Sequence, residues 1–203
     1  MDYIVIGLSN NPDFVFNDEV KSLLSCSRVF SGGKRHYGLV KKDLPAEHQW
    51  IDIKSDMPAL FKQYKQVKAT IIVFASGDPL FYGFANTLKT YHPEAKLKIY
   101  PYFNSLQLLC QKCHIAYQSM INTSVHGRSW QELDVALIRQ NDLIGVLTDP
   151  AKTPAVIAQR MLEYNLNGYK MIVAEALEGD HEKINFLTLE EAAEQTFDSL
   201  NCV

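Results

Sequence analysis

The sequence lacks the features that mark membrane-spanning and nucleic-acid-binding chains. Its 203 residues contain no apolar run close to the ~20 residues that a membrane-spanning helix needs. No Lys/Arg run exceeds two residues and the formal net charge is −3, so a basic nucleic-acid-binding face is not expected. Residues 3–6 are apolar, but Gly7 and Pro12 interrupt that pattern, which is not typical of a secretory signal. We therefore expect a cytoplasmic protein with no membrane or nucleic-acid partner.

Cysteine is also scarce. The four cysteines are Cys26, Cys110, Cys113 and Cys202. This number is small for a disulfide-stapled fold and favours a reducing compartment. Cys110 and Cys113 form a C-x-x-C pattern, but no second pair of zinc ligands accompanies it. Both share helical spacing with Leu106 and Leu109, so we interpret them as core residues and expect no metal site.

Three familiar motifs are missing. No G-x-G-x-x-G follows the first apolar run, which argues against a nicotinamide or flavin site of the Rossmann type. The sequence has neither a G-x-x-x-x-G-K-[ST] phosphate loop nor the G-x-S-x-G elbow of serine hydrolases.

Short apolar runs alternate with helical patterns along the chain, which is typical of an α/β fold. The run 70–75 is rich in β-branched and aromatic residues without alternation, which favours a central strand of a parallel sheet. Asn17, Asp56 and Thr153 are expected helix N-caps, and Ser129 with Glu132 matches a capping box. The expected strands are 3–7, 28–31, 49–53, 70–75, 96–100, 119–125, 142–147, 170–177 and 183–187, with another beginning at 200.

These patterns predict two lobes. Residues 1–116 read as an N-terminal α/β lobe with a mostly parallel sheet. Residues 117–203 read as a C-terminal α/β lobe with a mixed sheet. The apolar ending at 200–203 also predicts that the chain is the N-terminal part of a longer protein.

The segment from Ser76 to Gly83, with the sequence SGDPLFYG, directly follows the best strand. Ligands of open α/β sheets bind beyond the carboxyl ends of the strands. Gly77 would let a ligand approach the backbone, and Asp78 could accept hydrogen bonds from an amine or from ribose hydroxyls. A plain strand–helix turn with Asp78 as the helix cap fits the same residues, and the local pattern leaves both interpretations open.

Motifs in a fixed order extend this segment into a family resemblance. They are the 3–7 strand, Ser31-Gly32-Gly33-Lys34-Arg35-His36, Ser76–Gly83, Pro101–Leu106, His126-Gly127-Arg128, and Leu147-Thr148-Asp149 with Thr153-Pro154. Through them the chain resembles the tetrapyrrole (corrin/porphyrin) methylases, and most closely the precorrin-6Y methylase branch of cobalamin biosynthesis. The resemblance covers nearly the whole chain. It implies a two-lobed fold that binds S-adenosylmethionine between the lobes, and a homodimer.

The resemblance also implies an activity, which is methylation of a meso carbon of precorrin-6Y or its cobalt form. A decarboxylating partner, separate or fused, would act with it. The implied cofactor-binding residues are Gly77, Asp78, Leu80, Phe81, Asn104, Ser105, Leu106, Leu147, Thr148, Ala176 and Leu177. The candidates for binding the carboxylate-rich corrinoid are Ser9, Lys34, Arg35, His36, His126 and Arg128. Of these, Lys34, Arg35, His36 and Arg128 are expected to pair with its carboxylates through charged hydrogen bonds.

No catalytic triad is expected, because the methyl sulfonium of the cofactor is already a strong electrophile. Two loops depart from the family pattern. Residues 7–13 lack the usual glycines, and Asn10 and Asn11 can supply left-handed backbone in their place. Residues 101–105 also lack a glycine. Two alternatives stay open: a ribosomal RNA ribose methylase of the same fold, and a non-catalytic corrinoid-binding or scaffold module.

Overall fold

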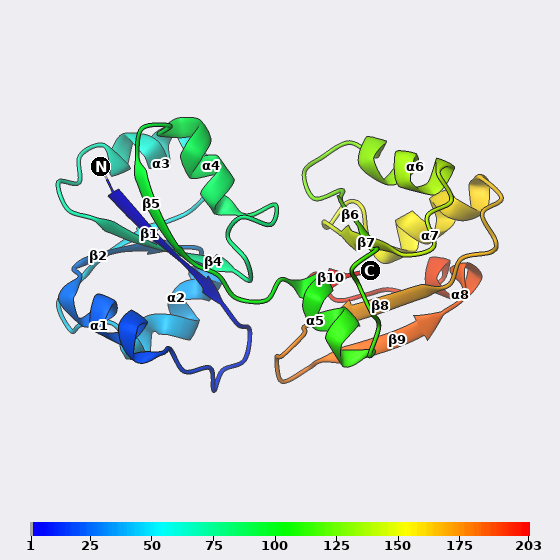
Figure 1. The fold of residues 1–203 in the computed structure, drawn as a ribbon, viewed down its shortest axis with the longest axis horizontal. Coiled ribbons are helices and arrows are strands. Elements are labelled where there is room, and N and C mark those ends of the chain that lie inside the picture. The colour runs from blue at the N-terminus through cyan, green and yellow to red at the C-terminus, as the bar shows by residue number, and fades with distance from the viewer. Residues whose placement is uncertain (1) are drawn as a thin grey trace. The chain divides into compact units, whose positions relative to one another are not determined.

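The computed structural model describes residues 2–203, which divide into two compact units (Figure 1). The first ends at Asn104 and the second begins at Ser105, whereas the sequence analysis placed the boundary at 116/117. The difference is one helix, α5 (Ser105–Lys112), which belongs to the second unit. There a Cβ on Gly145 would lie 2.7 Å from the Leu106 side chain, so α5 is packed directly on the second sheet. No helix of residues 2–203 is long and apolar enough to cross a bilayer.

The first unit contains a five-stranded sheet in the order β3-β2-β4-β1-β5. All of its strand pairs are parallel, as predicted. The strands are β1 (Asp2–Leu8), β2 (Val29–Gly32), β3 (Gln49–Asp52), β4 (Ile71–Ser76) and β5 (Lys96–Tyr100).

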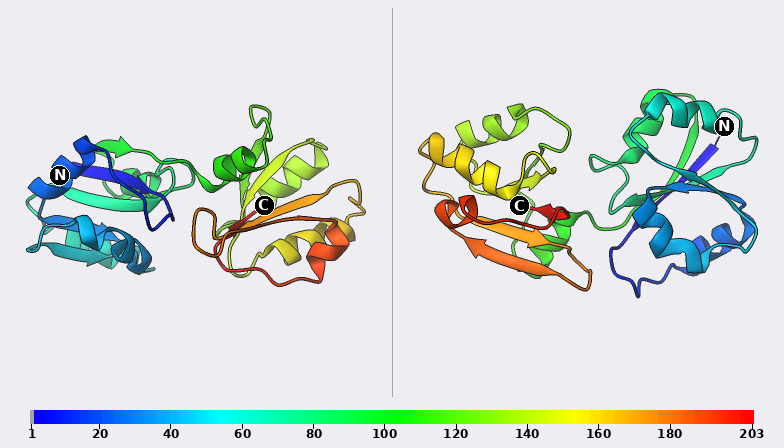
Figure 2. Two further views of the ribbon diagram at one scale, coloured as in Figure 1. Left: turned by 90° about the horizontal axis from the view of Figure 1, so that it is seen from below. Right: turned by 180° about the vertical axis from the view of Figure 1, so that it is seen from behind.

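Helices cover both faces of this sheet (Figures 1 and 2). They are α1 (Asp18–Cys26), α2 (Lys34–Val40), α3 (Met57–Tyr64) and α4 (Phe84–Tyr91), with a short 3-10 turn η1 (Lys41–Asp43). Ile72 and Phe74 of β4 pack in the core beneath α1 and α2. Ile71 and Val73 pack in the core beneath α3 and α4. This burial on both faces explains why residues 71–75 of β4 are all apolar.

The connections place a ligand-binding position between β1 and β4. These two strands are neighbours, yet the helix after β1 covers one face and the helix after β4 covers the other. The chain therefore continues from β1 and from β4 to helices on opposite faces of the sheet. In open α/β sheets such a topological switch point is the usual place for a ligand.

The second unit has a mixed sheet, as predicted, and its strand order is β6-β7-β10-β8-β9. Its strands are β6 (Ile121–Ser124), β7 (Ile144–Leu147), β8 (Met171–Glu175), β9 (Lys183–Leu187) and β10 (Asn201–Cys202). Only β6 and β7 pair in parallel; the other pairs are antiparallel. The last strand lies in the middle of the sheet, where Cys202 pairs with Leu147 of β7 and with Ala174 of β8.

The second unit's other helices are α6 (Gln131–Ile138), α7 (Pro154–Glu163) and α8 (Leu189–Ala193). The caps predicted at Asn17, Asp56 and Thr153 are all present. The capping box at Ser129 and Glu132 is wrong, because α6 begins at Gln131 and Glu132 instead accepts a hydrogen bond from the Ser124 amide at 3.3 Å. Neither α2 nor α8 was predicted, since helices of seven and five residues are too short to show a clear period.

The predicted core position of the C-x-x-C pattern holds for one of its cysteines. Cys110 is 5% exposed and lies 3.7 Å from the sulfur of Met120. Cys113 follows the end of α5 and is half-buried. All four cysteines are free thiols.

Candidate functional site

Three loops at the carboxyl edge of the first sheet are packed backbone to backbone. The Gly77 amide donates to the Leu8 carbonyl at 2.9 Å, and the Tyr102 amide donates to the Gly77 carbonyl at 3.2 Å. A Cβ on Gly7 would lie 2.0 Å from the Gly77 carbonyl oxygen. The loops after β1, β4 and β5 therefore meet only because residue 7 has no side chain.

Position 77 requires a glycine for two reasons, its backbone conformation and the atoms packed around it. Its φ is +58°, in the left-handed region that favours glycine. A Cβ here would lie 2.9 Å from the Phe103 carbonyl oxygen and 3.1 Å from the Asn104 Cα. The backbone of the loop after β5 therefore occupies the position that a Cβ of residue 77 would need.

The remainder of the SGDPLFYG segment is a rigid turn. Asp78 does not cap α4, which begins at Phe84; its Oδ1 accepts from the Leu80 amide at 2.8 Å. Gly83 closes the turn, since a Cβ there would lie 2.5 Å from the Pro79 carbonyl oxygen. The turn leaves the Leu80 side chain 44% exposed and Asp78 half-buried. An apolar surface and a carboxylate thus stand together at the switch point.

Helix α2 brings a second polar group to the same edge. The His36 Nδ1 accepts from the Gly33 amide at 3.2 Å, so the proton of the neutral ring is on Nε2, which donates to Ser76 Oγ at 3.0 Å. Burial, followed by the nearby charge of Arg35, lowers the pKa of His36 to about 4. At neutral pH His36 is therefore a neutral donor, not the cation expected for pairing with a carboxylate.

Arg35 links the loop after β1 to the end of β4. Its guanidinium donates to Asn10 Oδ1 at 2.6 Å and to Ser76 Oγ at 2.7 Å. Lys34, the first residue of α2, is exposed. Ser9 is only 3% exposed, and its Oγ accepts from the Asn11 amide at 2.8 Å, so it shapes its own loop.

Ser76 was not among the predicted binding residues. Its Oγ accepts hydrogen bonds from both Arg35 and His36. The signal that could have found it is its position as the last residue of β4, directly before Gly77.

In the second unit, several predicted cofactor residues bury their side chains. The exposed fractions are 1% for Leu106, 7% for Thr148 and 8% for Leu177. Thr148 Oγ1 donates to the Asn201 carbonyl at 3.0 Å. Such burial leaves little of these side chains for a ligand. In the first unit Asn104 is 8% exposed, so the same restriction applies to its side chain.

The turn after β8 holds a strained backbone. Ala176 and Glu178 have backbone φ angles of +47° and +62°, which residues other than glycine seldom adopt. Buried Glu175 stabilises the start of this turn by accepting from Asn185 Nδ2 at 3.1 Å and from the Asp198 amide at 2.6 Å. Such strain is common at ligand-binding positions.

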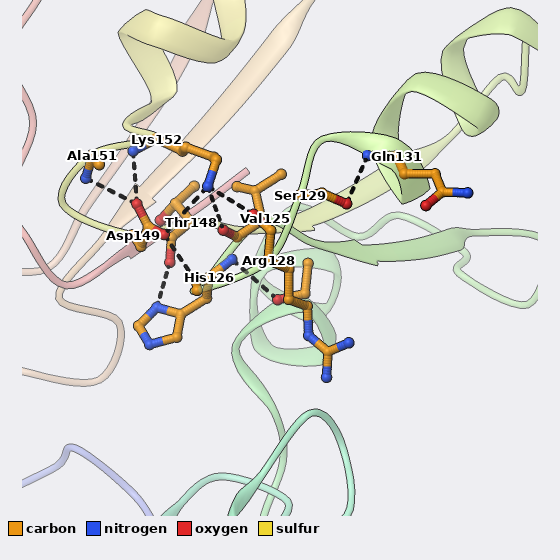
Figure 3. Close-up of polar contacts among 11 residues, drawn as sticks. Val125, His126, Arg128, Ser129, Gln131, Thr148, Asp149, Ala151 and Lys152 are labelled. Carbon is orange, nitrogen blue, oxygen red and sulfur yellow. Dashed lines mark hydrogen bonds and ion pairs between the residues drawn. The ribbon is translucent and has the colours of Figure 1, made fainter. Parts of the chain in front are cut away.

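The His126–Arg128 loop lies beside the end of β7 (Figure 3). His126 Nδ1 is 2.9 Å from the Thr148 carbonyl oxygen. The Gly127 amide donates to Asp149 Oδ2 at 2.9 Å, and Gly127 has a φ of +62°. Arg128 is exposed and lies 3.7 Å from Glu132.

Two residues outside the predicted set fix this loop. Asp149 also accepts from the amides of Ala151 at 2.9 Å and Lys152 at 2.7 Å. The hydrogen bond from Gly127, with those from Lys152 and Ala151, lowers the pKa of Asp149. Lys152 Nζ donates to the Arg128 carbonyl at 2.7 Å (Figure 3). The role of Asp149 could have been predicted from the sequence, because this residue belongs to the motif Leu147-Thr148-Asp149. The role of Lys152 could be recognised only in the structure.

The two units thus offer different chemistry. The first presents hydrogen-bond donors from Arg35 and Ser76, which can hold an anionic group such as a carboxylate. The second presents a histidine ring on a loop that the Asp149 carboxylate anchors. Within residues 2–203, no three His, Cys, Asp or Glu side chains are grouped to hold a metal ion.

Sequence comparisons find relatives over most of the chain, although no family model matches it. A cobalt-precorrin-7 C(5)-methyltransferase from Salmonella typhimurium is 28% identical over 193 residues, which cover 90% of this chain and 89% of the relative. A decarboxylating precorrin-6Y C(5,15)-methyltransferase from a Sinorhizobium species is 27% identical over 187 residues, 89% of this chain but 43% of that longer protein.

Solved structures give the same result for the fold. The precorrin-6Y methylase of Archaeoglobus fulgidus matches with a TM-score of 0.71 at 16% identity, covering 100% of this chain and 96% of that one. A uroporphyrin-III C-methyltransferase from Thermus thermophilus, complexed with S-adenosylhomocysteine, matches with a TM-score of 0.73 at 14% identity, covering 100% and 90%. The chain has the tetrapyrrole methylase fold, and the resemblance predicted from its motifs is confirmed.

Proposed function

We propose that this chain is an S-adenosylmethionine-dependent methyltransferase that methylates a meso carbon of precorrin-6Y, or of its cobalt form, in cobalamin biosynthesis. The observation that carries the proposal is the 28% identity to a cobalt-precorrin-7 C(5)-methyltransferase along 90% of the chain. The position of the SGDPLFYG turn at the switch point of the first sheet supports it, because ligands of such sheets bind there.

The groups at this turn fit the proposed cofactor. A carboxylate has about four acceptor positions, and Asp78 uses Oδ1 for the Leu80 amide, which leaves it capacity to accept from ribose hydroxyls. The exposed side chain of Leu80 offers an apolar surface to an adenine ring. When bound, S-adenosylmethionine would supply the methyl group as an electrophile. Gly77, Phe81, Asn104 and Ser105 complete the proposed contacts from the first unit and the start of α5.

The second unit would contribute mainly through its backbone. Leu106, Leu147, Thr148, Ala176 and Leu177 are the proposed cofactor contacts there, and three of them bury their side chains. Main-chain amides and carbonyls at strand ends can bind the polar groups of the cofactor without any side-chain contribution.

The substrate would be held through its carboxylates. Arg35 is the strongest candidate, because its guanidinium is already fixed by Asn10 and Ser76. His36 would support it as a neutral donor. Lys34, Arg128, His126 and Ser9 are the other proposed contacts, of which Lys34, Arg128 and His126 are exposed.

The test is incubation of the purified chain with S-adenosylmethionine and either precorrin-6Y or its cobalt form, followed by mass spectrometry. The expected product carries an added methyl group and is accompanied by S-adenosylhomocysteine. Calorimetry with S-adenosylhomocysteine measures cofactor binding separately. Corrinoid binding without cofactor affinity would select the non-catalytic module. Methylation of ribosomal RNA instead of the corrinoid would select the RNA methylase.

We also propose a homodimer, a decarboxylating partner and a cytoplasmic location. These rest on the resemblance and on the free thiols of the chain. Light scattering of the purified protein tests the dimer. Copurification with a decarboxylase acting on the acetate side chain of the corrinoid tests the partner.

A further inference from the structure

We propose that His126 is a catalytic residue, the base whose Nε2 accepts the proton released when the corrinoid carbon is methylated. This inference rests on the proposed function. It differs from the expectation that His126 only binds substrate and that methyl transfer involves no protein base.

The reaction itself requires a proton acceptor. A meso carbon carries one hydrogen, and methylation replaces that hydrogen. As the carbon forms its bond to the methyl group, the sulfur–methyl bond breaks and its electron pair remains on sulfur. The carbon then loses its hydrogen as a proton, and the C–H electron pair returns to the conjugated system. Each transfer therefore releases one proton, with no oxidant or reductant involved.

The hydrogen bond at Nδ1 prepares His126 for this role. A carbonyl oxygen can only accept, so the 2.9 Å contact with Thr148 requires the proton to be on Nδ1. In the neutral ring Nε2 is then the acceptor. Figure 3 shows the ring with Nδ1 toward Thr148 and the other nitrogen directed away from the residues drawn. A base oriented by a third group in this way is the usual arrangement in general base catalysis.

Hydrogen bonds hold the two residues that follow His126 in the loop. The Gly127 amide is bonded to Asp149, and the Arg128 carbonyl accepts from Lys152. Asp149 and Lys152 are mostly buried, with side-chain exposures of 12% and 21%. Their hydrogen bonds fix the loop, while the His126 residue remains exposed. An accessible base on a fixed loop is what proton transfer to a bound substrate needs.

Neither His36 nor His48 combines a free ring acceptor with a place at the carboxyl edge of a sheet. His36 has its Nδ1 occupied by the Gly33 amide and uses Nε2 as a donor, so it has no free acceptor. His48 does donate Nδ1 to a carbonyl, that of Pro45 at 2.7 Å. However, His48 precedes β3 and so lies at the amino end of a strand, opposite the edge where ligands bind. His48 therefore provides a matched control.

The experiment measures single-turnover methyl transfer and S-adenosylhomocysteine binding in three variants. In His126→Asn the amide nitrogen can still donate to Thr148, but the acceptor at Nε2 is lost. We expect its methyl-transfer rate to fall about 10²–10⁴-fold, the usual contribution of a general base, with the cofactor dissociation constant unchanged. His48→Asn should keep the full rate. In His126→Ala, added imidazole should restore part of the rate, which a purely structural role would not allow.

A spectroscopic measurement tests the same claim without turnover. In ¹⁵N-histidine-labelled protein, the signals lost in His126→Asn should belong to a ring protonated at Nδ1 and unprotonated at Nε2. An Nε2-protonated ring, or a His126→Asn rate within threefold of the wild-type rate, would overturn the inference. If the wild-type chain itself transfers no methyl group to the corrinoid, it is the proposed function that fails.

Discussion

Replacing Gly77 with alanine should destabilise the first unit more than the same change at Gly127 destabilises the second. Both glycines have left-handed backbone, with φ of +58° and +62°. They differ in their surroundings. A Cβ on Gly77 would lie 2.9 Å from the Phe103 carbonyl oxygen and 3.1 Å from the Asn104 Cα, whereas a Cβ on Gly127 would have nothing within 4 Å. The pair therefore separates backbone strain from steric overlap.

The two contributions have known sizes. Left-handed backbone costs an alanine about 1–2 kcal/mol relative to glycine. Extra volume forced into a packed position typically costs about 1–3 kcal/mol, and the atoms that oppose Gly77 are main chain, which cannot rotate away. We expect Gly127→Ala to lower the free energy of unfolding by about 1–2 kcal/mol and Gly77→Ala by about 2–5 kcal/mol. The larger loss is a substantial part of the ~5–15 kcal/mol that stabilises a typical domain.

The two tryptophans allow the units to be followed separately. Trp50 is in β3 of the first unit, and its ring stacks on Phe74 with centroids 6.1 Å apart. Trp130 caps α6 in the second unit. Urea unfolding followed by fluorescence in single-tryptophan backgrounds, with the other tryptophan replaced by phenylalanine, reports each unit by itself. Equal losses from Gly77→Ala and Gly127→Ala would refute the steric argument. Gly77→Ala should also weaken S-adenosylhomocysteine binding in calorimetry, because Asp78 follows directly.

Three further predictions concern the second unit and the thiols. Because folding lowers its pKa, the Asp149 carboxylate stabilises the fold above its ordinary pKa of about 4, and this contribution is lost as the pH falls through the lower pKa of the folded state. Asp149→Asn should therefore cost about 1–2 kcal/mol at pH 7 and progressively less as the pH is lowered, as measured by urea unfolding across a pH series. Thr153→Ala removes the α7 cap and should cost about 1 kcal/mol in the same assay. Ser129→Ala should cost less, because Ser129 is not the N-cap residue of α6 and its Oγ accepts only a long 3.4 Å hydrogen bond from the Gln131 amide. Burial raises the pKa of the Cys202 thiol to about 12. Alkylation of the native protein at pH 8 should therefore modify the exposed Cys26 well before Cys202, as measured by peptide mass mapping. Equal alkylation rates would contradict the buried position of Cys202.

Much of the fold could be predicted because its signals are local. The apolar run of β4 indicated a strand buried on both faces, and its place at the centre of a parallel sheet is confirmed. Asn17, Asp56 and Thr153 cap their helices as expected, since a cap depends only on residues within one turn. Motif order was also sufficient to identify the tetrapyrrole methylase fold.

The candidate site was predicted less completely, because its geometry depends on contacts between distant residues. Gly77 was singled out for the approach of a ligand, whereas the contact that requires a glycine there is with the backbone of residues 103–104. His36 was expected to be a cation, and burial beside Arg35 makes it neutral. Ser76 and Lys152 acquire their roles from partners 41 and 24 residues away, Arg35 and Arg128 respectively. A pattern of neighbouring residues cannot predict contacts between residues so far apart in the sequence.

The sequence by itself therefore determined which segments become strands, where the capped helices begin and which motifs the chain carries, because each depends on neighbours along the chain. Only the tertiary structure decided that β10 lies at the centre of the second sheet, that the loops after β1, β4 and β5 meet at Gly7 and Gly77, and that Thr148 fixes the proton of His126 on Nδ1. These features depend on which atoms are brought together in space, and it is the Nδ1 contact that leaves Nε2 free to accept a proton.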